Sequence, residues 1–232
     1  MSANRLLVMT ASFVAVLLMS VGCAGSNSGK ATATAKADAL FRDGQKIEAA
    51  RDTDRAIKRY EMALSEDPNH VPTLHALAAL QTQRMEYRDA ILTWKRYVVA
   101  TQGSADAFND LGYCQDLAGW PASAETSYRE ALAIDPDHHF ARVNLGLLLA
   151  RHGRGGEALI QLQTVMTPAQ AHYNLALAYE QVGKRLAAED EYSIAAWLDP
   201  SLIDASAHLE ACATEASAQA DTDTAAVQME VE

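Results

Sequence analysis

The sequence predicts an all-α protein whose helices stack lengthwise as a solenoid of about five helix-turn-helix units. One observation is a pattern of large and small residues that recurs about every 34 residues, most regularly in residues 105–138. A second is composition: the 232 residues are 49% hydrophobic but only 6% aromatic, with few prolines and glycines. Much of the apolar content is alanine, the best helix former, and a core built from alanine requires closely approaching helices.

Five units follow one residue order, and they cover residues 37–70, 71–104, 105–138, 139–168 and 169–202. The eighth position of each unit is small, the twentieth is always alanine, and the twenty-fourth is large. In order, these positions hold Gly44, Ala78, Gly112, Gly146 and Ala176; Ala56, Ala90, Ala124, Ala158 and Ala188; and Tyr60, Trp94, Tyr128, Leu162 and Tyr192. We expect the small residues to lie where the two helices of a unit cross, because a larger side chain there would force the helices apart.

The ends of the units are marked by proline, and one unit is irregular. Asp-Pro pairs at 67–68, 135–136 and 199–200 predict the end of a second helix, because proline cannot continue one. The fourth unit has only thirty residues and a glycine-rich middle at residues 153–156. We expect a shortened second helix there and a local change in the path of the stack.

The order Phe108, Leu111, Gly112, Ala124, Tyr128, Ala131 and Pro136 resembles the tetratricopeptide repeat (TPR) family. The resemblance implies a right-handed α-solenoid that binds other proteins, with the first helices of the units lining a concave groove. It also fits a capping helix over residues 203–218, followed by an acidic disordered tail at 219–232. Carried over position by position, the groove residues are Phe41, Gln45, His75, Ala79, Gln83, Asn109, Tyr113, Asp116, Phe140, Val143, Leu147, Arg151, Tyr173, Leu177 and Gln181.

The implied groove is aromatic and aliphatic toward units three to five, which suits an apolar peptide segment or an amphipathic helix. Two alternatives stay open. Val143, Leu147 and Leu177 could instead pack against neighbouring helices, or the C-terminal helix could fold into the groove. One TPR subclass grips the acidic ends of chaperones with lysine, arginine and asparagine at set positions, and that set is absent here.

The first residues predict export and lipidation. Residues 1–22 have the layout of a secretory signal peptide, with Arg5 followed by an apolar stretch. Ser20-Val21-Gly22-Cys23 resembles a bacterial lipobox, although Ser20 stands where leucine is usual. The resemblance implies a lipid on Cys23, and Ala24 after it is typical of lipoproteins sent to the outer membrane. An ordinary cleaved signal and an uncleaved anchor are the alternatives. Residues 23–36 are polar and small, so we expect a flexible tether.

Charge and reactive residues exclude several functions. The net charge is −11, and eleven acidic residues but no lysine or arginine follow Arg185. No basic stripe is present to neutralise nucleic-acid phosphates. Seven histidines show no metal-site spacing, so we expect no metal or cofactor. His138 and His139 are interpreted as solvated loop residues, and His70 and His75 as incidental residues around a helix start. Cys114 and Cys212 are interpreted as small buried residues. No catalytic motif is found, which predicts that the protein is not an enzyme.

Together these features predict a non-enzymatic scaffold, lipid-anchored in the bacterial cell envelope, that presents its groove to another envelope protein. The layout resembles that of lipoproteins that help assemble pilus secretins, and of adaptors for cell-wall enzymes. The alternative function is a soluble periplasmic carrier that encloses a lipid or an apolar small molecule in units three to five.

Overall fold

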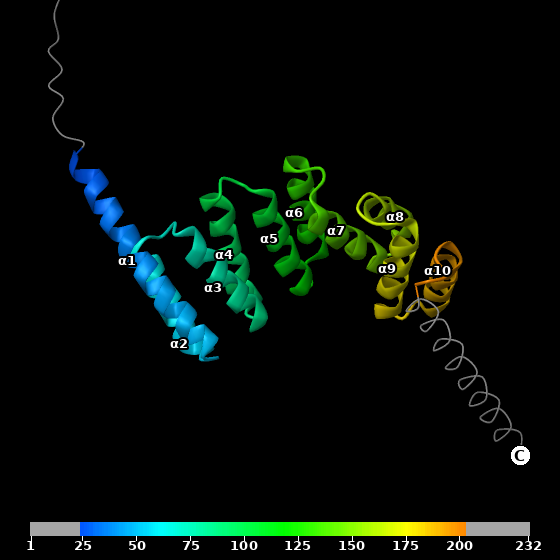
Figure 1. The fold of residues 1–232 in the computed structure, drawn as a ribbon, viewed down its shortest axis with the longest axis horizontal. Helices are drawn as coiled ribbons and strands as arrows, with labels where there is room; N and C mark the ends of the chain where they lie inside the picture. Colours follow the sequence, from blue (N-terminus) through cyan, green and yellow to red (C-terminus); the bar gives the residue numbers. More distant parts are fainter. Residues whose placement is uncertain (1–23, 203–232) are drawn as a thin grey trace, which may run out of the picture.

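The structure, a computed structural model, describes residues 24–202, and within this range it is entirely helical. The helices form five antiparallel pairs that follow one another along the long axis of the molecule, from α1 in blue to α10 in orange (Figure 1). The helices are α1 (Ala24–Ala49), α2 (Thr53–Glu66), α3 (Val71–Gln83), α4 (Tyr87–Ala100), α5 (Ala105–Leu117), α6 (Pro121–Ile134), α7 (His139–Arg151), α8 (Gly155–Gln163), α9 (Pro168–Gln181) and α10 (Arg185–Leu198). The prediction of an all-α solenoid is confirmed.

The contact of small residues with large ones within each pair is also confirmed. A Cβ atom added to Gly112 would lie 2.7 Å from Cε1 of Tyr128, and one added to Gly44 would lie 2.5 Å from Cε1 of Tyr60. At Gly146 the corresponding contact is with Leu162, at 2.8 Å. No real Cβ fits at such distances, so these glycines let the first and second helices of a unit touch.

The buried clusters join neighbouring pairs as well as the two helices of one pair. Tyr60 and Leu64 of α2 pack with Leu74 and Leu77 of α3, so the second helix of one unit covers the first helix of the next. The core is therefore a series of apolar clusters along the stack, several of which span two units, as expected for a repeat array in which each unit contacts its neighbours.

The fourth unit departs from this arrangement, as its sequence predicts. Helix α8 has only nine residues, against fourteen in the other second helices. Its short length leaves α7 to contact α9 directly, with Leu148 and Leu149 of α7 in the same cluster as Ala171 and Leu175 of α9. Helix α7 thus contributes to the contact between units four and five, where α8 is too short to cover α9 alone.

The expected flexible tether over residues 23–36 is wrong for the residues that the structure describes. Residues 24–36 are the beginning of α1, which runs without a break to Ala49. Thr34 donates a hydrogen bond of 2.8 Å to the Asp67 carboxylate, and Lys36 lies 3.6 Å from Glu66. The alanines of this stretch favour a helix, and these two contacts attach it to the end of α2.

Several predicted features lie outside the described residues. They are the signal peptide, Cys23, the capping helix at 203–218 and the acidic tail. Within residues 24–202, no helix is both long and apolar enough to cross a membrane.

Candidate functional site

The predicted groove residues lie on the first helices α1, α3, α5, α7 and α9, but they differ widely in exposure. Six are exposed to solvent: Gln45, His75, Gln83, Tyr113, Phe140 and Gln181. Eight are partly buried: Phe41, Ala79, Asp116, Val143, Leu147, Arg151, Tyr173 and Leu177. Asn109 is only 8% exposed. We refer to the side chains of these five helices that reach solvent as the first-helix surface.

The structure brings four of the predicted residues into one cleft between α3 and α5: His75, Ala79, Gln83 and Tyr113. The cleft has a volume of about 330 Å³. Its remaining walls are Thr82 of α3, Trp94 of α4 and Asp110 of α5. Trp94 and Asp110 are not among the predicted groove residues, because the repeat pattern identifies Trp94 as a core residue and gives Asp110 no role.

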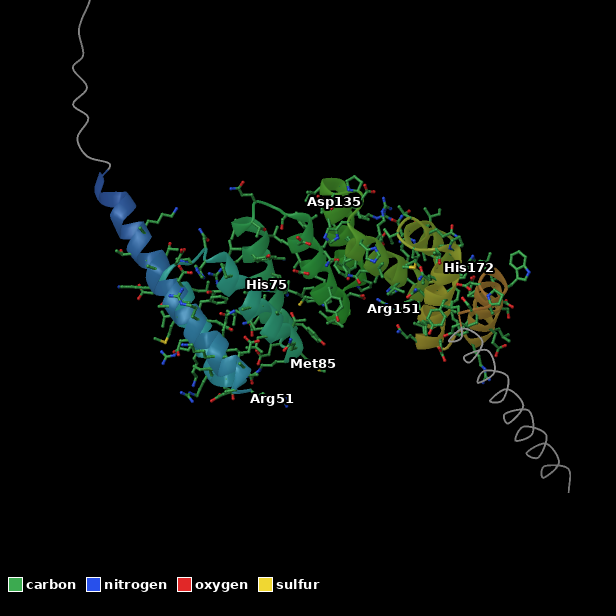
Figure 2. All side chains as sticks on the ribbon, viewed as in Figure 1. Arg51, His75, Met85, Asp135, Arg151 and His172 are labelled. Carbon is green, nitrogen blue, oxygen red and sulfur yellow. The ribbon has the colours of Figure 1, made fainter. Side chains whose placement is uncertain are left out.

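Aromatic contacts fix one wall of this cleft. The ring of His75 packs edge-on at 5.3 Å from Trp94 and 5.4 Å from Tyr97, measured between centroids. The indole N–H of Trp94 donates to Thr82 Oγ1 at 3.1 Å. Such edge-to-face pairs stabilise a fixed arrangement of rings, so the wall is preformed. Figure 2 shows where His75 lies along the stack, on the second of the five helical pairs.

Asp110 places a carboxylate in the cleft, and its neighbours stabilise the negative charge only weakly. Its Oδ2 lies 3.7 Å from Nε2 of His75, and its Oδ1 accepts a long hydrogen bond of 3.3 Å from the Asn109 amide. Its side chain is 30% exposed. Burial raises the pKa of the Asp110 carboxyl above its ordinary value, while His75 acts in the opposite direction. The ionised carboxylate is therefore held at some cost in free energy.

Asn109, Asp116 and Arg151 connect α5 to α7 instead of forming an open groove. The Asn144 amide donates to Asn109 Oδ1 at 2.9 Å, and Arg151 forms a close ion pair with Asp116. The prediction that Asn109 lines the groove is wrong, because its amide is buried in this contact between units. Asp116 and Arg151 keep partial exposure, but each has the other as its partner.

Most of the apolar residues predicted for the groove in units three to five pack against the core. Val143 and Leu147 lie on the cluster that contains Leu145, and Leu177 lies on the cluster around Tyr192. Tyr173 lies 5.7 Å from the Tyr192 ring. The alternative of packing against neighbouring helices therefore describes these residues better, and Phe140, 66% exposed, is the clear exception.

A hydrogen bond between the twenty-fourth and twelfth positions of a unit recurs along the stack. Tyr60 donates to Glu48 at 2.5 Å, Trp94 donates to Thr82 at 3.1 Å, and Tyr192 donates to Glu180 at 2.7 Å. In the third unit the pair is Tyr128 and Asp116. The hydroxyl of Tyr128 is buried and, within the described residues, has no hydrogen-bond partner. Burial raises the pKa of this phenol, and the Asp116 charge adds to the effect.

Two histidines that the sequence suggests are incidental or solvated are in fact buried and bonded. Nε2 of His138 lies 2.9 Å from Asp106 and its Nδ1 accepts from the backbone N–H of Ala141, so it caps α7. Nε2 of His70 lies 3.1 Å from Asp38 in the same way. Both pairs are separated by 32 residues. That repeated spacing of aspartate and histidine is a sequence signal that could have revealed them.

The chemistry available on this surface is non-covalent binding. Within residues 24–202, no group of three or more histidine, cysteine, aspartate or glutamate side chains could hold a metal ion. The Cys114 thiol is buried, and burial raises its pKa, which makes it a poor nucleophile. What the surface offers is a preformed aromatic cleft and a half-buried carboxylate.

A row of helical hairpins whose core clusters join neighbouring units, with a cleft on the first helices, defines a helical-repeat protein of the α-solenoid class. The sequence model of the family "Tetratricopeptide repeat" matches residues 105–138. Solved structures with the same fold include several TPR proteins. The third unit is therefore a tetratricopeptide repeat, as the sequence predicts, and the array as a whole is similar in fold to TPR proteins.

Among solved structures, the chain is similar to MamA, with 27% identity and a TM-score of 0.58 over 70% of this chain and 91% of that one. It shares its fold with YrrB, described as a TPR protein with an unusual peptide-binding site, at 21% identity and a TM-score of 0.56 over 74% of this chain and 90% of that one. Among curated proteins, the probable biofilm formation methyltransferase WspC of Pseudomonas aeruginosa is 37% identical over 68 residues, which are 29% of this chain and 16% of WspC. The chain spans between 10% and 16% of the curated relatives that it matches.

Proposed function

We propose that the protein is a scaffold without enzymatic activity that binds a peptide segment or helix of another protein on its first-helix surface. The observation that carries this proposal is the cleft between α3 and α5, where His75 and Tyr113 are exposed and the ring contacts of His75 fix one wall. A TPR fold is suited to binding other proteins, and YrrB offers a structural precedent for peptide binding by this fold. Rigid aromatic side chains supply contact area at low entropic cost.

We further propose that the protein is lipid-anchored in the bacterial cell envelope through Cys23, at the periplasmic face of the outer membrane. The lipobox-like residues 20–23 support this proposal. The helix that begins at Ala24 changes how such an anchor would work. The thirteen helical residues before Ala37 would span about 20 Å at about 1.5 Å per residue, so a helical spacer would replace the flexible one.

The proposed partner is another envelope protein, in pilus, secretion or cell-wall machinery. The carrier alternative gains no support from the cleft, which lies over units two and three and has Thr82, Gln83 and Asp110 in its walls. An enclosed apolar pocket over units three to five would be needed for a lipid or an apolar small molecule.

Replacing Tyr113 and Tyr173 together by alanine should reduce partner capture about tenfold or more, because aromatic side chains on a binding surface dominate binding energy. The measurement is quantitative mass spectrometry of proteins retained by the purified chain from detergent-solubilised envelope. The matched control replaces Trp120 and Trp197, exposed aromatic residues on the second-helix side, by alanine.

Tyr173 is partly buried, so thermal unfolding of both double variants and of Tyr113→Ala alone accompanies the capture experiment. The proposal is contradicted when the wild-type chain enriches no envelope protein. It is also contradicted when the Tyr113 and Tyr173 variant captures the same proteins as the tryptophan control.

Replacing Cys23 by serine should abolish lipid labelling of the full chain, because only the thiol accepts a thioether-linked lipid. The measurement is metabolic labelling with a palmitate analogue in a bacterial host, followed by detection on the immunoprecipitated protein. Cys114→Ser serves as the control and should keep the full label. Label retained by the Cys23 variant would contradict the anchoring proposal.

A further inference from the structure

The acidic residues of α5 differ in how closely a basic side chain lies to each carboxylate. Asp106 pairs with His138 at 2.9 Å, and Asp116 pairs closely with Arg151. Within residues 24–202, Asp110 has one ion-pair partner, His75, at 3.7 Å, which is beyond hydrogen-bond distance, and one long hydrogen bond of 3.3 Å from the Asn109 amide. Because α5 contains no lysine or arginine, the cleft has an excess of negative charge at Asp110.

The partial burial of Asp110 means that water solvates its negative charge incompletely. A carboxylate in water has its charge solvated on all sides, whereas the Asp110 side chain is only 30% exposed and accepts one long hydrogen bond from Asn109. Burial dominates the shift of its pKa, which is upward. A cation that entered the cleft would recover the electrostatic stabilisation that the neighbours do not supply.

The walls around Asp110 fit the rest of a long basic side chain. Tyr113, 48% exposed, presents aromatic surface, which attracts cations and covers methylene groups, and the largely buried Trp94 contributes a small part of the wall. Ala79 contributes a small apolar floor, and Gln83 has an exposed amide that can accept a hydrogen bond. Lysine and arginine have this composition, with an apolar stem and a charged head.

We propose that the cleft between α3 and α5 is a subsite for one lysine or arginine side chain of the bound peptide. The cationic head pairs with the Asp110 carboxylate, and the stem lies against Ala79, Trp94 and Tyr113. Arginine is the stronger occupant, because its planar guanidinium can bond a carboxylate at two points and stack on an aromatic ring. This inference rests on the proposed function and specifies the chemistry of the segment that the first-helix surface takes.

The test uses NMR titration of the chain with the peptide acetyl-Ala-Leu-Arg-Leu-Ala-amide. The indole N–H of Trp94 reports on the cleft, and the two other tryptophans, Trp120 and Trp197, report on other surfaces. We expect the Trp94 signal to shift with the peptide. The same peptide with citrulline, which has a similar shape but no charge, should bind about tenfold more weakly.

Asp110→Asn keeps the shape of the side chain and removes its charge, so it should raise the dissociation constant of the arginine peptide about tenfold. The matched control is Glu130→Gln, which removes one negative charge from an exposed position on α6 of the same unit. Thermal unfolding checks that both variants are folded. In the unaltered chain, rising salt concentration should weaken binding of the arginine peptide more than that of the citrulline peptide.

Equal binding of the arginine and citrulline peptides would overturn the inference, as would no effect of Asp110→Asn. Absence of binding, or shifts confined to Trp120 and Trp197, would overturn it as well. The proposed function would survive these results if partner capture still depended on Tyr113. It would fail separately if no partner were captured.

Discussion

Replacing Trp94 by alanine should lower the free energy of unfolding by about 3–5 kcal/mol, the usual cost of removing a large buried aromatic side chain. Trp94 is only 4% exposed and packs with Ala78, Ala90 and Leu111, so its loss leaves a cavity at the junction of units two and three. The variant also leaves Thr82 without the indole donor at 3.1 Å. Denaturant unfolding followed by circular dichroism measures the change.

Trp120→Ala is the control for this experiment, since Trp120 is 45% exposed at the start of α6. Its effect should stay within about 0.5 kcal/mol, as for most surface substitutions. Equal effects of the two substitutions would show that Trp94 is not a core residue. The cleft would also lose one wall in Trp94→Ala, so partner binding should weaken together with stability.

Replacing Gly112 by alanine should destabilise the protein by about 1–3 kcal/mol, even though alanine is the better helix former. The added Cβ would lie 2.7 Å from Cε1 of Tyr128, and a buried aromatic ring cannot move aside without disturbing its own neighbours. The two helices of unit three would have to separate. The same denaturant experiment measures the change in the free energy of unfolding.

Gly156→Ala is the matched control, because a Cβ at Gly156 in α8 meets nothing within 4 Å. It should be neutral or should stabilise by up to about 1 kcal/mol, the ordinary gain of alanine over glycine in a helix. A similar loss of stability in both variants would contradict the assignment of the effect at Gly112 to its contact with Tyr128.

The repeat register could be predicted from the sequence because each unit has to solve the same packing problem. Gly112 and Tyr128 are sixteen residues apart in one unit, and equivalent pairs recur in the others, so the pattern reports a contact directly. The nine-residue α8 could be predicted for the same reason, since four residues are missing from its unit. A single sequence reveals most clearly those contacts that recur at the same positions of every repeat.

The surface could be predicted only in part. His75 and Tyr113 follow from family positions, but the exposure of each first-helix residue depends on how neighbouring units meet. Asn109 and Asn144 bond across units, which removes Asn109 from the surface. Asp110 becomes notable only because α3 lies opposite it. Such contacts between units carry no fixed spacing in one chain, so they needed the structure.

The prediction of a flexible tether was also wrong for residues 24–36, because the composition of this segment is compatible with both a linker and a helix. Residues 24–36 are small and polar, as in flexible linkers, but they also contain alanines that favour a helix. Thr34 and Lys36 contact Asp67 and Glu66 at the far end of α2, which are thirty or more residues away in the sequence. The composition of a segment does not show such a distant partner.

The unpaired hydroxyl of Tyr128 has a consequence for how the array unfolds. In units one, two and five the residue at the twelfth position bonds within its own unit, which adds to the intrinsic stability of that unit. Asp116 instead pairs with Arg151 of the next unit, and within residues 24–202 the Tyr128 hydroxyl has no hydrogen-bond partner. In a one-dimensional array, this difference lowers the intrinsic stability of the third unit and strengthens its interface with the fourth. The third and fourth units should therefore unfold and refold together. As a result, the shortened α8 should unfold cooperatively with α5.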